Sequence, residues 1–490
     1  MSSNLAIITT TLVSILFASI GILYSKRKNF NIEDFLVARG STSTPVTTAT
    51  ISASVIGAWV LFSPAEAGTW AGLTSLIGYA IGQASPLICF AILGPRLKNL
   101  IPEGHSILEY AWHRYGRYTH IICALVTISY LFVFLTAELT AISSALKEIS
   151  DVPLIITAIV IGGFTAIYTA YGGMRASIIT DSIQFTLITP LVIIVFVALL
   201  SNLGGITDSI NVVTQNRPEL LSLSHIPGIE FGITLIFAVF AANMFHQGFW
   251  QRIYSARNNR AIKLGFGSSA IIVMPIILMT GFIGIIASAR ATVENPSVAF
   301  FNLSKEILPE GFIIALLILA IALVMSSLDT LLNGITSAIT TDISRIKPHL
   351  KPGVLLKYAR VFTITLMVPA IIVASQGYSV LYLFLVADLI CSAAVVPVFY
   401  GLYSRKITDK NAAISFMIGL VIGSIFFPTP AEGYSTTWLP GSIQIPLSGK
   451  MLVSFSIALV ISGILSWILS CRNEKNKYEF SQLNKNIKQF

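Results

Sequence analysis

Charged residues are scarce in this 490-residue chain: 11% of its side chains are Asp, Glu, Lys or Arg, whereas 54% are hydrophobic. A soluble domain carries about 25% charged residues, so the composition excludes an ordinary soluble enzyme. The 31 Lys and Arg outnumber the 22 Asp and Glu, which gives a formal net charge of +9. Because these basic residues are divided among short segments between apolar stretches, they indicate membrane topology, and no nucleic-acid partner is expected.

The chain also lacks the motifs of common cofactor sites. It has no Gly-rich phosphate loop, no HExxH pair and no CxxC spacing, so nothing in it suggests a nucleotide, zinc or metal-cluster site. Its four cysteines lie in or beside apolar stretches, where we expect them to pack as small hydrophobic side chains. The sequence therefore predicts an all-α polytopic membrane protein that is not an enzyme.

Long apolar stretches are abundant instead. A bilayer-spanning helix needs about 20 mostly apolar residues, and about thirteen stretches meet that requirement. The predicted spans are 4–25, 45–70, 71–97, 119–147, 152–172, 176–201, 229–253, 263–289, 311–342, 354–376, 379–403, 410–429 and 450–471. Shorter helices are predicted within 99–118 and 290–310.

The basic residues predict an orientation. No cation precedes the first apolar run, and Lys26, Arg27 and Lys28 follow it directly. Loops then alternate between cation-rich and cation-poor along the chain; the segment 202–229, for example, has only Arg217. Since cytoplasmic loops carry the excess of Lys and Arg, we expect a multi-pass protein of the plasma (inner) membrane with its N-terminus outside and its C-terminus in the cytoplasm.

The stretch 319–342 is apolar enough to span a bilayer, yet oxygen-bearing side chains gather at its middle. A helix places four of them on one face, and Ser327 lies at the edge of that face. These four are Ser326, Asp329, Thr330 and Asn333. An acid within a membrane indicates function, and oxygen ligands suit a hard cation, so the stretch predicts half of a cation site. Alternatively, the hydroxyls bond back to their own helix or join neighbouring helices.

Two other spans are interrupted by small or polar residues. The stretch 44–59 (TPVTTATISASVIGAW) predicts a break near Ser54–Gly57, and 241–252 (AANMFHQGFWQR) has a similar interruption. Broken helices at membrane depth mark binding sites in secondary transporters. The two lie five helices apart and enter from opposite sides, as in two inverted five-helix repeats. For 44–59, the alternative is a helix whose small residues permit close packing.

Asp181 is a second acid in an apolar span, after a predicted turn at Gly172–Gly173. It either lines an ion pathway or complements the dipole at the start of its helix. At the end of the second interrupted helix, Arg252 is expected to form a pair or to extend to the membrane surface.

Four stretches together resemble the sodium:solute symporter family, which includes carriers of proline, sialic acid, galactose and urea. They are SASVIGAW at 52–59, YGGMRASIITDSIQ at 171–184, HQGFWQR at 246–252 and MSSLDTLLNGITSAITTDI at 325–343. The resemblance covers roughly 5–470. It implies a LeuT-type fold of two inverted five-helix repeats, with one extra N-terminal helix and two extra C-terminal helices.

On this basis the chain divides into 1–44 (N-terminal helix and loop), 45–201 (first repeat), 202–228 (external loop), 229–403 (second repeat), 404–471 (two helices) and 472–490 (cytoplasmic tail). The resemblance also implies a sodium site, formed by backbone carbonyls of the broken helix and of the stretch 319–342 and by hydroxyls of that stretch. Its ligands would be Ala53, Ile56, Leu323, Ser326 and Ser327. A second cation or proton site would use Asp181, Asp329 and Thr330. Asp329 adds a charge that the family pattern lacks, and Val55 replaces an aspartate of the proline carriers.

We expect the solute to bind between the two breaks. The candidate contacts are Trp59, Glu138, Asn243, His246, Gln247 and Asp388. The expected function is sodium-coupled symport of a small polar organic solute, with an amino acid such as proline, or urea, favoured. The alternatives are proton-coupled symport through Asp181 and Asp329 or, less readily, a transporter-like sensor. The expected partners are the solute, Na⁺ and the bilayer, with a monomer as the functional unit.

Overall fold

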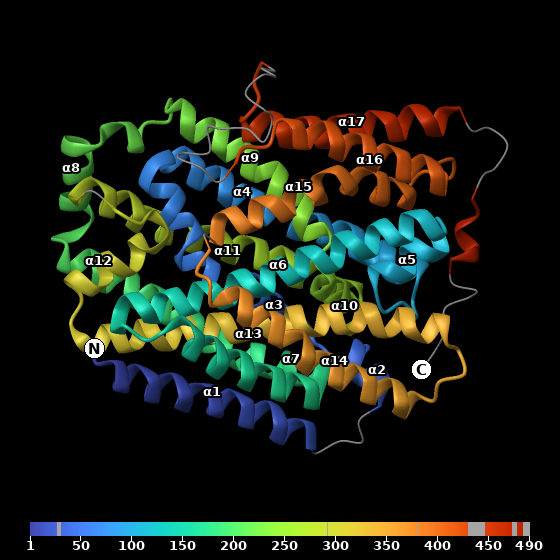
Figure 1. The fold of residues 1–490 in the computed structure, drawn as a ribbon, viewed down its shortest axis with the longest axis horizontal. Helices are drawn as coiled ribbons and strands as arrows, with labels where there is room; N and C mark the ends of the chain where they lie inside the picture. Colours follow the sequence, from blue (N-terminus) through green and yellow to red (C-terminus); the bar gives the residue numbers. More distant parts are fainter. Residues whose placement is uncertain (27–30, 292, 379, 430–445, 473–477, 484–490) are drawn as a thin grey trace.

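The computed structural model describes the chain except residues 27–30, 292, 379, 430–445, 473–477 and 484–490. Most of the described residues are helical, and the long helices run side by side along one direction (Figure 1). The longer helices are α1 (Ser3–Lys26), α3 (Thr44–Val55), α4 (Ser63–Leu100), α6 (Arg117–Ser150), α7 (Leu154–Asn202), α9 (Ile226–Met244), α11 (Asn259–Arg290), α13 (Glu310–Ile346), α14 (Pro352–Ala374), α15 (Val380–Phe399), α16 (Asp409–Ile425) and α17 (Met451–Cys471).

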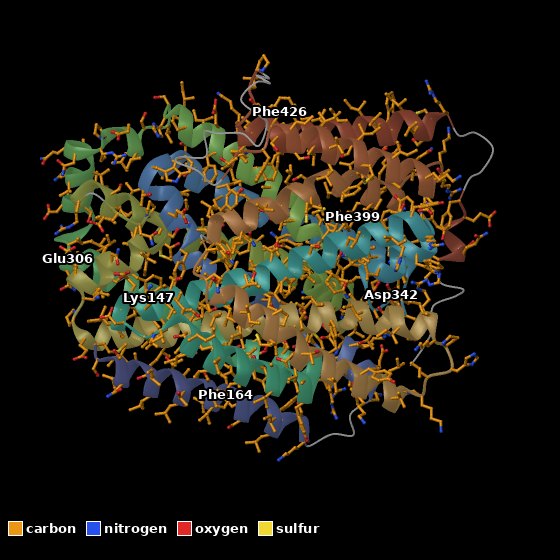
Figure 2. All side chains as sticks on the ribbon, viewed as in Figure 1. Lys147, Phe164, Glu306, Asp342, Phe399 and Phe426 are labelled. Carbon is orange, nitrogen blue, oxygen red and sulfur yellow. The ribbon has the colours of Figure 1, made fainter. Side chains whose placement is uncertain are left out.

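Short helices join these long ones. They are α2 (Ile32–Leu36), η1 (Ala58–Leu61), α5 (Ile107–Arg114), α8 (Gly205–Asn216), η2 (Pro218–Leu221), α10 (Gln247–Ser255), η3 (Pro296–Val298), α12 (Ala299–Ile307), η4 (Tyr400–Leu402) and η6 (Phe480–Gln482). The helices predicted within 99–118 and 290–310 are α5 and α12. Figure 1 shows α8 and α12 at one end of the bundle and α5 at the other. Glu306 and Asp342 likewise lie toward opposite ends (Figure 2).

Two glycines divide the longest helices at the predicted boundaries between spans. Gly72 within α4 has φ +66°, and Gly173 within α7 has φ +54°. A Cβ atom at Gly72 would lie 2.4 Å from the Leu220 carbonyl oxygen, and one at Gly173 would lie 2.5 Å from the Phe35 ring. Glycine is required at both positions because other residues resist this conformation and space is absent.

Among the described residues, each predicted span overlaps helix in the structure. Within the described residues, ten helices are long and apolar enough to cross a bilayer; α7 contains two predicted spans, and α4 contains the span 71–97 and the end of the span 45–70. The chain is therefore an all-helical, multi-pass membrane protein, and the exact number of thirteen crossings stays a prediction.

The outer helices expose apolar side chains at a spacing of four residues. On α1, Ile8, Leu12 and Leu16 are more than half exposed, and α14 and α17 repeat this pattern. Such a stripe fits contact with lipid. In contrast, α13 crosses the interior (Figure 1), and its residues from Leu319 to Ala338 are all buried. The polar face of α13 is therefore enclosed by protein.

Both predicted interruptions are present. Helix α3 ends at Val55, and the backbone is non-helical at Ile56 (φ −89°, ψ 83°) and Gly57 (φ −88°, ψ −176°) before η1 begins. Helix α9 ends at Met244, and α10 begins after His246, whose backbone is extended (φ −71°, ψ 96°). Each interruption leaves backbone groups without their helical partners.

A charged network joins α2 to the segment between α4 and α5. His105 Nε2 lies 2.6 Å from Glu33 Oε2, and its Nδ1 lies 3.3 Å from Glu109 Oε1. Arg39 Nε donates to Glu33 Oε1 at 2.6 Å. Burial alone would lower the pKa of His105, but Glu109 and Glu33 outweigh it and raise the pKa to about 9. The network therefore holds His105 as a cation at neutral pH.

This network predicts a pH-dependent stability. Because the folded pKa of His105 exceeds its ordinary value of 6.5, its contribution is complete below about pH 6.5 and is lost as the pH rises through about 9. The difference in unfolding temperature between wild type and His105→Gln should therefore be largest at pH 6 and smallest at pH 10. His225→Gln is the control, because the contact of His225 is with the uncharged Trp70 carbonyl. A constant difference for His105→Gln across this range would contradict the account.

Candidate functional site

The break in the α3–η1 helix faces the middle of α13. A Cβ atom at Gly57 would lie 2.4 Å from Ser327 Oγ and 2.5 Å from Glu138 Oε1, so only glycine fits between α13 and α6. One turn away, Ser54 Oγ lies 3.1 Å from Thr330 Oγ1. These two contacts hold the residues at the break against the hydroxyl-rich face of α13.

Glu138 satisfies the backbone N–H groups that the break exposes. Its carboxylate accepts from the Ala58 N–H at 2.7 Å and from the Trp59 N–H at 3.2 Å. A carboxylate is favourable at the start of a helical segment, where N–H groups lack intrahelical partners. Glu138 thereby caps η1 from α6, and it is fully buried.

The break also frees carbonyl oxygens. The Gly57 N–H donates to the Val55 carbonyl at 3.2 Å, and the Val60 N–H donates to the Gly57 carbonyl at 3.2 Å. Within the described part of the chain, no donor therefore reaches the carbonyls of Ala53 and Ile56. Unpaired carbonyls at this depth are costly unless they face a cavity or an ion.

The remaining predicted sodium ligands lie on α13. Ser326 Oγ donates to Asp181 Oδ1 at 2.5 Å, which leaves its lone pairs for another partner. Ser327 Oγ donates to the Leu323 carbonyl at 3.0 Å, so these two ligands contact each other. Leu323, Ser326 and Ser327 therefore lie within one turn of α13, the helix that packs against the break.

Asp181 on α7 is joined to a buried arginine. Arg252 Nη2 donates to Asp181 Oδ2 at 2.7 Å and to Thr330 Oγ1 at 2.8 Å, and both charged side chains are fully buried. Thr50 Oγ1 donates to the same carboxylate oxygen at 2.5 Å. Of the two expectations for Arg252, pairing is confirmed and extension to the membrane surface is wrong, because the α9–α10 break turns the side chain toward α7.

Asp329 on α13 is surrounded by hydroxyl donors. Tyr168 donates to it at 2.7 Å, Ser177 at 2.8 Å and Thr180 at 3.1 Å. Ser177 also reaches Asp181 at 3.4 Å, so the two acids share one polar cluster. The predicted group of Asp181, Asp329 and Thr330 is therefore brought together, and Arg252 completes it. The sequence contained one signal for this role of Arg252, namely a cation at the end of an apolar stretch.

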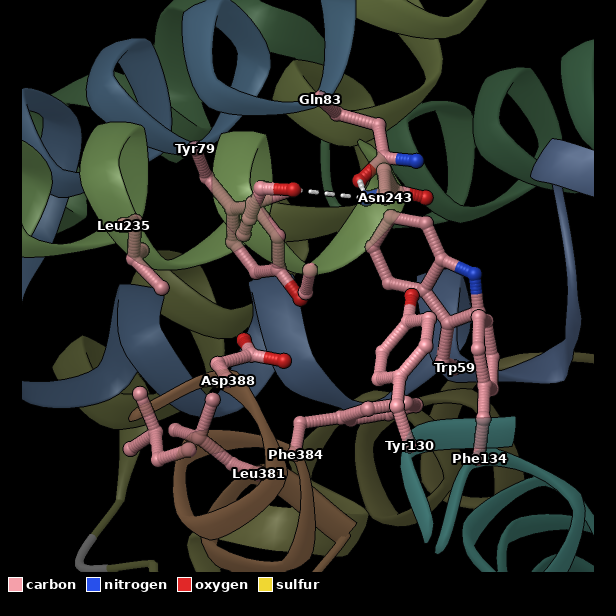
Figure 3. A pocket seen from close by; sticks show the side chains of 13 residues that line it. Trp59, Tyr79, Gln83, Tyr130, Phe134, Leu235, Asn243, Leu381, Phe384 and Asp388 are labelled. Carbon is pink, nitrogen blue, oxygen red and sulfur yellow. Dashed lines mark hydrogen bonds between the residues drawn. The ribbon is translucent and has the colours of Figure 1, made fainter. Parts of the chain in front are cut away.

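A separate cavity lies between η1, α4, α6, α9 and α15 (Figure 3). Three of the six predicted substrate contacts line it: Trp59, Asn243 and Asp388. The other lining residues were not anticipated. They are Tyr79, Gln83, Tyr130, Phe134, Leu235, Val239, Ala242, Leu381, Phe384 and Leu385.

The other three predicted contacts lie elsewhere. Glu138 caps η1, as described above. His246 stacks on Phe249 with ring centroids 4.3 Å apart. Gln247 accepts from the Ile107 N–H at 3.0 Å and donates to the His105 carbonyl at 2.8 Å. None of the three is among the lining residues of the cavity.

An all-helical membrane bundle with two interrupted helices beside a cavity is the architecture of a secondary transporter. Comparison with known proteins defines it further. The sequence model of the sodium:solute symporter family matches residues 35–419. The chain therefore belongs to this family, and it is a sodium-coupled solute symporter.

Individual relatives of the chain are also transporters. The chain is 27% identical over 480 residues to the spermidine transporter DUR31 of Candida albicans, covering 93% of this chain and 89% of that protein. It is 24% identical over 475 residues to the sodium/glucose cotransporter of Vibrio parahaemolyticus, covering 86% and 84%. In fold it is similar to a Na⁺-coupled sialic acid symporter in a substrate-bound, outward-open state, with a TM-score of 0.77, 16% identity and coverage of 97% and 99%. The fold is thus of the LeuT type.

The capping role of Glu138 predicts an effect on sodium affinity. Glu138→Ala should raise the sodium concentration that gives half-maximal stabilisation by roughly tenfold, because charged hydrogen bonds of about 1.5 kcal/mol or more hold the break in place. Thr140→Val is the matched control on α6, since Thr140 Oγ1 bonds only within its own helix. Thermal unfolding at increasing sodium concentration measures both. Equal sodium affinity in the two variants would contradict the capping role.

The buried ion pair predicts strong thermodynamic coupling. Asp181→Asn and Arg252→Gln should each destabilise the protein by about 3–5 kcal/mol, because each leaves a buried charge unpaired. The double variant should lose less unfolding free energy than the sum of the losses in the two single variants.

Unfolding of the purified protein by denaturant measures this cycle. Glu219→Gln provides the comparison: its partner Arg217 lies at 2.6 Å, but both side chains are about 40% exposed, so a loss of less than about 1 kcal/mol is expected. Additive effects at Asp181 and Arg252 would show that the pair does not act as a unit.

Proposed function

We propose that this protein imports a small polar organic solute with one sodium ion, which binds at the junction of the α3 break and α13. The single observation that carries the proposal is the pair of unbonded carbonyls, of Ala53 and Ile56, opposite the hydroxyls of α13. With Leu323, Ser326 and Ser327 they offer five neutral oxygens, which is suited to a hard cation. Neutral ligands bind such an ion weakly enough for release.

Asp181 orients the sodium site and does not itself take a second ion. Its carboxylate holds the Ser326 hydroxyl, while the Arg252 guanidinium occupies the position between Asp181 and Thr330. A fixed cation in that position repels a second mobile one. Asp329 is then the remaining acid, held by three hydroxyl donors from α7.

We infer that the protein lies in the plasma membrane as a monomer, with its N-terminus outside and its C-terminus in the cytoplasm. The alternation of basic loops supports this orientation of the two termini. The solute would bind in the cavity between the two breaks, and the repeats 45–201 and 229–403 would rearrange around it. Sodium entry down the membrane potential supplies about 2.3 kcal/mol per charge per 100 mV.

The sodium site is tested with sodium itself as the ligand. Sodium should raise the unfolding temperature of the purified protein relative to equal potassium, because a ligand of the folded state stabilises it. Ser326→Ala and Ser327→Ala should each weaken this effect by roughly tenfold in sodium concentration. Val55→Ala is the matched control, because its side chain offers no ligand.

Equal sodium affinity in all three variants would remove the site assignment. No sodium effect in the wild type, together with solute binding that follows pH, would instead favour proton coupling through Asp181 and Asp329.

A further inference from the structure

Among the described residues that line the cavity, Asp388 is the only one with a charged side chain. It lies on α15 and is 4% exposed. Within the described residues, no hydrogen-bond donor and no cation reaches its carboxylate at bonding distance, and Figure 3 shows it pointing into the cavity. Every ligand that enters the cavity must therefore be compatible with this group.

The other buried acids of the membrane-embedded region all have donors. Glu138 has two backbone N–H groups, Asp181 has Arg252, and Asp329 has three hydroxyls. Glu66 accepts from Ser297 Oγ at 2.8 Å. Asp388 departs from this pattern, and an isolated carboxylate in such a site is costly unless a partner arrives. The missing partner is consequently to be sought in the ligand.

Aromatic rings form the walls around Asp388. Trp59 and Tyr79 stack with centroids 5.4 Å apart, and Phe134 meets Phe384 edge to face at 4.8 Å. Tyr130 lies 5.9 Å from Phe134. The faces of aromatic rings attract cations, most strongly when water is excluded. The walls and the carboxylate thus favour the same sign of charge.

Neutral and anionic solutes fit the cavity less well. Among the described lining residues there is no Lys, Arg or His, so the ammonium group of a zwitterion such as proline could pair with Asp388 but its carboxylate would have no protein cation. A neutral solute such as urea would offer Asp388 no ionic partner. At the far side of the cavity, Asn243 Nδ2 donates to Gln83 Oε1 at 3.5 Å. This amide pair can bind a polar group at the other end of a solute.

We propose that the transported solute is a small organic cation whose ammonium group binds between Asp388 and the aromatic walls. This inference rests on the proposed transport function and specifies its substrate class. It replaces the sequence-based preference for proline or urea, because neither supplies a net positive charge. The amide pair of Gln83 and Asn243 would contact the uncharged end of the solute.

The test measures binding of defined probes to the purified full-length protein in sodium and in potassium, by thermal unfolding and calorimetry. The cationic probes are choline, agmatine, putrescine and spermidine. The uncharged isostere of choline, 3,3-dimethylbutan-1-ol, together with proline, urea and glucose, completes the panel. At least one cationic probe should bind in sodium, and the isostere should not.

Asp388→Asn should weaken binding of that probe by roughly thirtyfold or more, as expected when one partner of a buried charged pair is removed. Sodium alone should still raise the unfolding temperature of the Asp388→Asn variant. Glu66→Gln is the matched control, because it removes a buried carboxylate of α4 that does not line the cavity.

Three outcomes would overturn the inference while leaving sodium coupling intact: no response to any cationic probe, sodium-dependent binding of proline, urea or glucose that Asp388→Asn leaves unchanged, or equal binding of choline and its isostere. Cation binding that is lost in Asp388→Asn but does not depend on sodium would support the inference and contradict the proposed coupling. The two ideas can therefore fail separately.

Discussion

The interruption of a helix inside an apolar bundle is the constraint on which the rest of this structure depends. Backbone groups freed at Ile56–Gly57 are buried, and such groups at membrane depth require partners. Glu138 takes the N–H groups on one side of the break. Within the described residues, the carbonyls of Ala53 and Ile56 on the other side have no such partner. The proposed ion site is located where the protein leaves half of the break unsatisfied.

The buried charges are distinguished by what surrounds each of them. Asp181 is held by Arg252 and by hydroxyls, so its charge is compensated within the protein. Asp329 has donors but no direct cation partner, and Asp388 has neither within the described residues. The three acids therefore differ in their partners: Asp181 has a cation, Asp329 has only hydroxyl donors, and Asp388 is open to a ligand. Low dielectric in the interior makes such differences large, which is why one fold can use several carboxylates for different purposes.

Local patterns in the sequence predicted much of this arrangement. Small residues marked the α3 break, Gly173 marked the turn within α7, and polar residues three and four apart marked the buried face of α13. The Arg252–Asp181 pair was not predictable, because it depends on how α10 turns toward α7. The cavity walls were also missed: Tyr79 and Gln83, or Tyr130 and Phe134, are spaced like ordinary core residues. His246 and Gln247 looked suited to substrate binding, but the orientation of α10 directs Gln247 to the α4–α5 segment.

Equilibrium binding of radioactive sodium to the purified protein tests the central claim most directly. If the carbonyls of the α3 break and the hydroxyls of α13 form the site, and Arg252 occupies the neighbouring position, binding should saturate at one sodium per chain. Unlabelled sodium should displace the bound ion and potassium should not. Two ions per chain, or no saturable binding, would contradict the account.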